Sequence, residues 1–112
     1  MVGYDGSDAA ARALDFAADL AGYGSTIAVV TVRTNGSDGS AAIAAREQLQ
    51  QRLVQAGYHE TTGEPAQELV QKAHELEADL LVIGRSSSGR PLVESVSSRV
   101  IRQADCDVLV VR

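Results

Sequence analysis

Residues 78–84, Ala-Asp-Leu-Leu-Val-Ile-Gly, decide the fold class of this chain. Four consecutive large apolar residues, Leu80–Ile83, show no polar alternation, and a glycine ends the run at position 84. A short, uninterrupted apolar run is typical of a strand that is covered on both faces, as the strands of parallel sheets are. We therefore expect a buried strand of a parallel sheet here.

Short apolar runs and amphipathic patterns alternate through the rest of the chain. Five strands are predicted, at residues 1–5, 25–32, 58–62, 80–83 and 108–111. Of four predicted helices, the first begins at Asp8 behind a Ser7 cap and the second follows the polar loop of residues 34–40. The third begins at Pro65, and the fourth covers residues 95–104. Glycines at positions 22, 24 and 57 are expected to end the first two helices.

Apolar residues at helical spacing mark the face of each helix that we expect to pack inward. In chain order they are Ala10, Ala13, Leu14, Ala17, Leu20 and Ala21; Ala42, Ala45, Leu49, Leu53 and Ala56; Ala66, Leu69, Val70, Ala73 and Leu76; and Val96, Val100, Ile101 and Ala104.

This alternation predicts one α/β domain, residues 1–112, with a doubly wound five-stranded parallel sheet and helices on both faces. In such sheets ligands bind beyond the carboxyl ends of the strands, where the strand order reverses.

Composition narrows the function classes. The net charge of −5 argues against general nucleic-acid binding, and no apolar run is long enough to cross a membrane. Cys106 is the single cysteine, so no intrachain disulfide can form, and we expect a cytoplasmic protein. Residues 84–102 carry four arginines against Glu94, and this cationic segment either attracts a small anion or is merely solvated.

Two strand ends are candidate binding sites. Asp5 lies at the carboxyl end of the first predicted strand, where its carboxylate could accept hydrogen bonds from a ribose hydroxyl or an adenine amino group, or could simply tie the loop. Residues 84–98 supply glycines, serines and arginines before a helix, which is a plausible phosphate cradle. The segment is neither a Walker A loop nor a dinucleotide GxGxxG motif.

Several segments taken together resemble the universal stress protein family, over nearly the whole chain. They are VGYDGS at residues 2–7 with the following Ala/Leu helix, GEPA at 63–66, ADLLVIG at 78–84, SVSSRVI at 95–101 and CDVLVV at 106–111.

This resemblance implies an adenine nucleotide α-hydrolase-like fold with the sheet order 3-2-1-4-5. Asp5 and Gly84 would then face each other across the reversal between strands 1 and 4. ATP-binding members carry a Gly-x2-Gly-x9-Gly-Ser/Thr pattern there. Carried over by position, the implied nucleotide-binding residues are Asp5, Val32, Ile83, Gly84, Ser95, Val96 and Ser97, with Gly89 as a stand-in for a lost glycine.

The chain departs from that pattern. Ser87 replaces the second glycine, Glu94 replaces the third, and position 94 follows Gly84 by 10 residues instead of 13. Glu94 brings negative charge toward a triphosphate, although a helix start otherwise suits it. We therefore expect a degenerate site for ATP, with magnesium, or for an AMP-like ligand. The alternative is a dimeric scaffold or partner-binding module without a nucleotide.

No catalytic residue is predicted, although slow ATP hydrolysis stays open. A phosphoacceptor receiver domain would need an aspartate after strand 3 and a lysine after strand 5, where Thr62 and Arg112 stand instead. His59 and His74 have no ligand cluster at metal-binding spacing, and we expect the thiol of Cys106 to be inert.

The last strand suggests a partner. Strand 5 would lie at a sheet edge with an apolar run that proteins usually cover or pair. Since members of the family commonly dimerise through this strand, we expect a homodimer through Val108, Leu109, Val110 and Val111. Coverage within the monomer is the alternative.

Overall fold

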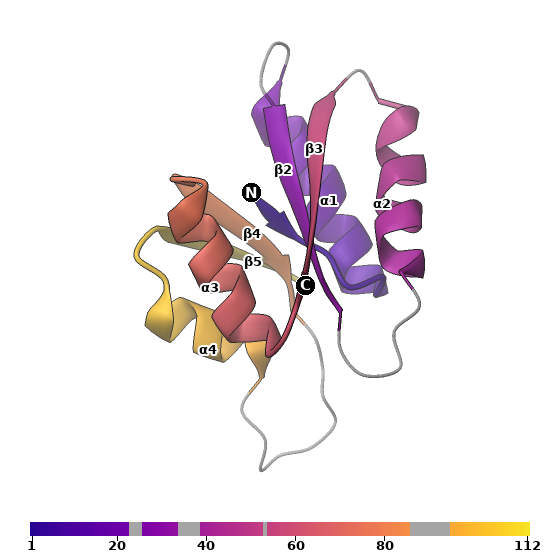
Figure 1. The fold of residues 1–112 in the computed structure, drawn as a ribbon. Coiled ribbons are helices and arrows are strands. Elements are labelled where there is room, and N and C mark those ends of the chain that lie inside the picture. Colours follow the sequence, from indigo (N-terminus) through magenta and orange to yellow (C-terminus); the bar gives the residue numbers. More distant parts are fainter. Residues whose placement is uncertain (23–25, 34–38, 53, 86–94) are drawn as a thin grey trace.

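The computed structural model describes residues 1–22, 26–33, 39–52, 54–85 and 95–112, and Figure 1 shows their arrangement. The strands are β1 (Val2–Gly3), β2 (Thr26–Arg33), β3 (Gln55–Thr62), β4 (Leu80–Gly84) and β5 (Asp107–Val111). The helices are α1 (Asp8–Ala21), α2 (Ser40–Gln50), α3 (Pro65–Glu75) and α4 (Val96–Gln103).

All neighbouring strands of the sheet are parallel, and their order is β3-β2-β1-β4-β5. The short central strand β1 pairs on both sides, with Val2 opposite Val29 of β2 and Val82 of β4. The predicted doubly wound α/β fold and its strand order are therefore confirmed.

The sheet separates two hydrophobic cores. Helices α1 and α2 cover one face and α3 and α4 cover the other (Figure 1). Leu14 and Val29 are fully buried in the first core, and Val100 and Leu81 in the second. Because both faces of the sheet are covered, the inner strand β4 is apolar without alternation, as the run at 80–83 indicated.

Helix α1 begins and ends at the predicted residues. The hydroxyl of Ser7 accepts a hydrogen bond from the backbone N–H of Ala10 at 3.1 Å, which caps one of the free N–H groups of the first turn. Gly22 ends the helix with φ +62°, a conformation that glycine adopts without strain. Gly24 and Ser25, which the sequence assigned to the turn and the next strand, lie outside the described residues.

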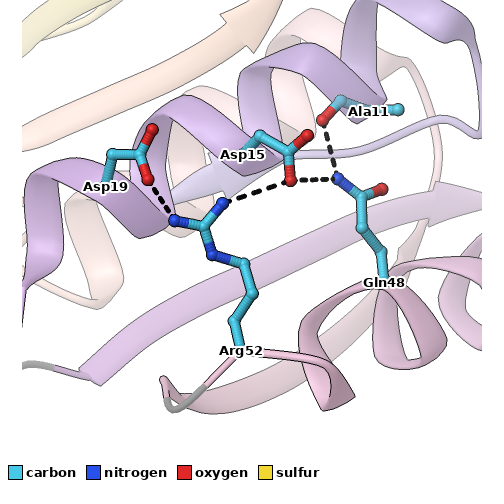
Figure 2. A network of polar contacts seen from close by, with 5 residues as sticks. All are labelled: Ala11, Asp15, Asp19, Gln48 and Arg52. Carbon is cyan, nitrogen blue, oxygen red and sulfur yellow. Dashed lines mark hydrogen bonds and ion pairs between the residues drawn. The ribbon is translucent and has the colours of Figure 1, made fainter.

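A polar network joins α1 to α2 on the outer side of that layer (Figure 2). Arg52, just after α2, forms ion pairs with Asp15, at 3.5 Å, and with Asp19 of α1. The amide of Gln48 donates to the carbonyl of Ala11 at 2.8 Å and to Asp15 at 2.9 Å. The ion pairs and the Gln48–Asp15 contact are exposed, so they orient the two helices more than they stabilise the fold.

The predicted boundary between α2 and β3 is wrong. The helix ends at Gln50 rather than at Ala56, and Ala56 and Gly57 lie inside β3, which pairs with β2 over its whole length. Ala56 fits both the helical spacing of α2 and the two-residue alternation of a strand. In the structure it alternates with Tyr58 on the face that packs against the α1/α2 core. Leu53, predicted for the same helix face, lies outside the described residues.

Three residues predicted to point inward are exposed: Leu20 (56%), Leu76 (37%) and Ile101 (58%). Leu20 lies in the last turn of α1, and Leu76 follows the last residue of α3. Ile101 lies about 100° around the helix axis from the buried Val100, on the side of α4 that is exposed to solvent.

Candidate functional site

A pocket of about 320 Å³ opens at the carboxyl end of the sheet, at the reversal of strand order between β1 and β4. Asp5 and Tyr4 from the end of β1, Val32 from β2 and Ile83 and Gly84 from β4 contribute to its wall. The two strand ends that the sequence singled out therefore meet in one crevice, where ligands of doubly wound sheets bind.

The starts of all four described helices also reach this pocket, through Ala10 of α1, Ala41 of α2, Pro65 of α3 and Val96 of α4. Helix N-termini carry free N–H groups and a partial positive charge. The pocket therefore combines an apolar wall with a setting that favours an anionic group.

Five of the eight predicted site residues line the pocket: Asp5, Val32, Ile83, Gly84 and Val96. Ser95 and Ser97 lie beside it at the start of α4 and are not part of the wall. Gly89, like Ser87 and Glu94, lies outside the described residues. Nucleotide contact by any of these residues stays a prediction.

Asp5 ties the turn after β1, which is one of the two roles that the sequence left open. Its Oδ1 accepts a hydrogen bond from the backbone N–H of Ser7 at 2.9 Å, across Gly6 with φ +86°. The residue is exposed and lines the pocket. One carboxylate oxygen thus holds the turn, and among the described residues no hydrogen bond reaches the other oxygen.

Tyr4 lies buried beside Asp5. Burial, and secondarily the charge of Asp5, raises the pKa of the Tyr4 phenol above its ordinary value. The phenol is therefore neutral throughout the physiological range and adds no charge to the pocket.

Gly84 allows β4 to end against α1. A Cβ atom at this position would lie 2.5 Å from the carbonyl carbon of Ala9 and 2.6 Å from the backbone nitrogen of Ala10. Because both neighbours are backbone atoms, neither can move aside cheaply. The glycine is therefore required for the close approach that forms this side of the pocket.

The serines at the start of α4 bind one another. The hydroxyl of Ser95 accepts from the backbone N–H of Ser98 at 3.2 Å and donates to the Ser98 hydroxyl at 2.8 Å. The hydroxyls of Ser95 and the buried Ser97 are 3.2 Å apart. A phosphate group at this helix start would have to replace these internal hydrogen bonds.

Sequence reasoning missed an ion pair between the starts of α3 and α4, whose first residues Pro65 and Val96 line the pocket. Arg99 of α4 donates to the carboxylate of Glu64 at 2.6 Å, and the same carboxylate caps α3 through the backbone N–H groups of Ala66 (3.3 Å) and Gln67 (2.8 Å). The Glu-Pro pair at the start of α3 is a detectable capping signal. Nothing in the spacing of positions 64 and 99 connects them.

The arginines of the cationic segment, residues 84–102, are less available to an anionic ligand than the composition of the segment indicated. Arg99 is paired with Glu64, and Arg102 lies in the last turn of α4, away from the helix start. Arg90 lies outside the described residues, and Arg85 is exposed after β4.

Among the residues that the structure describes, no group of three or more His, Cys, Asp or Glu side chains could hold a metal ion. His74 instead pairs with Asp105 on the surface, at 2.8 Å.

Burial raises the pKa of the half-buried Cys106 thiol, and the negative charge of Asp105 is the second cause. No helix within the described ranges is long and apolar enough to cross a membrane.

The parallel sheet in the order 3-2-1-4-5, with its pocket at the reversal, defines an α/β protein of the adenine nucleotide α-hydrolase-like class. The Universal stress protein family model matches residues 1–112, and the chain belongs to that family.

Solved and curated relatives agree with this assignment. A crystal structure of a universal stress protein in complex with cAMP is 30% identical, with a TM-score of 0.85, over 99% of this chain and 93% of that one. The universal stress protein from Archaeoglobus fulgidus in complex with dAMP is 25% identical, with a TM-score of 0.75, over 99% and 94%. A universal stress protein of Methanocaldococcus jannaschii is 45% identical over 53 residues, which span 45% of this chain and only 31% of that protein.

Proposed function

We propose that this domain binds an adenine nucleotide in the β1/β4 pocket, with nucleoside monophosphates and cyclic monophosphates as its preferred ligands. The observation that carries the proposal is the meeting of Asp5 and Gly84 in one pocket at the sheet reversal. The relatives with cAMP and dAMP, which match nearly the whole chain, support the ligand class.

The pocket suits a small ligand of mixed character. Its volume of about 320 Å³ is at the lower end of the range of about 300–1,000 Å³ that ligand pockets span. Val32, Ile83 and Val96 offer apolar contact to a purine ring, and Asp5 offers an acceptor to an amino group or a ribose hydroxyl. The helix starts around the rim favour the phosphate.

A triphosphate is the weaker candidate. The glycine pattern of ATP-binding members is incomplete, the Ser95 hydroxyl is engaged, and Arg99 is paired with a carboxylate. Magnesium would enter only with a triphosphate, whose phosphate oxygens would supply its ligands.

Calorimetric titration of the wild type with AMP, cAMP and ATP, repeated with Asp5→Asn, tests the proposal. We expect saturable binding of the monophosphates and a loss of about tenfold or more in affinity in the variant, because a charged acceptor is removed. Asp107→Asn is the matched control, since it removes an exposed carboxylate at the amino end of β5. The absence of heat with every nucleotide, or equal losses in both variants, would contradict nucleotide binding at this pocket.

We further propose that the domain acts by binding rather than by catalysis, in the cytoplasm. No described side chains form a nucleophile and base pair in the pocket wall, and the lone Cys106 fits a reducing compartment.

The runner-up function is a dimeric scaffold without a nucleotide. It is favoured by β5, an edge strand whose residues Val108–Val111 are all only partly buried in the monomer. Homodimerisation through this strand is compatible with both functions.

A further inference from the structure

The Glu64–Arg99 pair lies where it can influence how much negative charge the pocket tolerates on a bound ligand. Glu64 directly precedes Pro65, and Arg99 lies three residues after Val96, and both Pro65 and Val96 line the pocket. Arg99 also belongs to the first turn of α4, because its N–H donates to the carbonyl of Ser95 at 3.2 Å. The pair therefore bridges the starts of α3 and α4, next to two residues of the pocket wall.

The Glu64 carboxylate carries more contacts than an ordinary helix cap. It accepts from two backbone N–H groups of α3 and from the Arg99 guanidinium at 2.6 Å, and both side chains are about a third exposed (35% each). A guanidinium held by a carboxylate at this distance has part of its donor fork and most of its charge committed.

The electrostatic consequence depends on the number of phosphates. With Glu64 in place, Arg99 offers little net positive charge to a ligand, while Asp5 and Glu64 both place carboxylates at or beside the pocket. A nucleoside brings no phosphate charge into this field and a monophosphate at most about two negative charges, whereas a triphosphate brings more and meets repulsion that grows with each of them.

We propose that Glu64 is a specificity-determining residue that makes the pocket select adenine nucleotides of low charge over triphosphates, by neutralising Arg99. This inference rests on the proposed function, because it assumes that adenine nucleotides bind in the β1/β4 pocket.

The test compares the affinities of adenosine, AMP and ATP for the wild type and for Glu64→Gln by calorimetry at two salt concentrations. The glutamine retains an oxygen that can cap α3 but releases the Arg99 charge. We expect adenosine affinity to stay the same and ATP affinity to rise about three- to tenfold relative to AMP, with a steeper salt dependence. Arg99→Gln should lower the ATP-to-AMP affinity ratio instead.

Asp19→Asn is the control, because it also removes one negative charge and an arginine partner, but on the α1/α2 surface. A purely structural role for the pair would change the affinity for all three ligands by the same factor, and thermal unfolding of each variant identifies such a loss. An unchanged ATP-to-AMP ratio in Glu64→Gln, with adenosine still bound, overturns this inference and leaves the proposed function intact. Failure of the wild type to bind any of the three ligands overturns both.

Discussion

Gly84 shows how a single residue without a side chain can form part of a site. It ends β4, lines the pocket, and lets the backbone of α1 approach to a distance at which no Cβ atom fits. The glycine was predicted from the sequence as the end of a buried run. The close contact with Ala9 and Ala10 could not be predicted, because it depends on the angle at which α1 crosses the sheet.

Gly84→Ala should lower the free energy of unfolding by about 3 kcal/mol, since the new methyl group would overlap the backbone of α1. Chemical denaturation measures this loss. Gly57→Ala in β3 is the matched control, because its Cβ atom would meet only the His59 ring, at 3.7 Å. The control should leave stability unchanged or raise it by about 0.5 kcal/mol. Equal stability of the two variants would contradict the packing argument.

At the level of elements, the turn from β1 into α1 supports both fold and site. Asp5 accepts from the N–H of Ser7, and Ser7 in turn caps α1, so the carboxylate that lines the pocket and the helix start are held by adjacent hydrogen bonds. The orientation of Asp5 therefore depends on a helix that is correctly capped.

Ser7→Ala should cost about 1 kcal/mol of folding free energy, because the N–H of Ala10 loses its acceptor. Urea denaturation gives the change. Ser98→Ala serves for comparison, since among the described residues its hydroxyl accepts from the Ser95 hydroxyl and caps no backbone N–H, and its loss should cost much less. A comparable loss of folding free energy in both variants would contradict this prediction, because it would show that removing any serine hydroxyl has this effect, whether or not it caps a helix.

The elements themselves were largely predictable, because their starts carry local signals. Ser7 before α1 and Pro65 at the start of α3 indicated those helices correctly. The error at Ala56 arose because helical and strand periods coincide there, and pairing with β2, which decides between them, is a long-range contact.

The site was predictable only in part. Asp5 and Gly84 lie at the carboxyl ends of predicted strands, and the family resemblance brought those strands together in the predicted order. The Glu64–Arg99 pair was not predictable, because it depends on how α3 and α4 pack, and no local pattern encodes that packing.

At the scale of the whole molecule, the sheet has two edges of different character. β3, with Gln55, His59 and Glu60, is polar, whereas β5 is apolar from Val108 to Val111. An apolar edge strand pairs readily with another chain, and a two-fold axis would let β5 pair with its own copy.

Light scattering at micromolar concentration should therefore give twice the monomer mass. Val110→Lys should shift the protein toward the monomer, because a charge would be placed in the shared strand pair, and circular dichroism checks that it folds. Thr62→Lys adds the same charge at the β3 edge and should stay dimeric. A wild type that scatters as a monomer would contradict pairing through β5.

Strand β2 sends Ile27 and Val29 into the core beneath α1 and α2, and Val30 and Val32 into the core beneath α3 and α4. A slip of one residue would exchange these side chains between the two compartments without burying any charge. The polarity of the side chains therefore does not disfavour a sheet with a shifted register. The correct register is selected by steric fit, and only after the helices have packed on the sheet, because contacts as close as the one at Gly84 allow a single alignment.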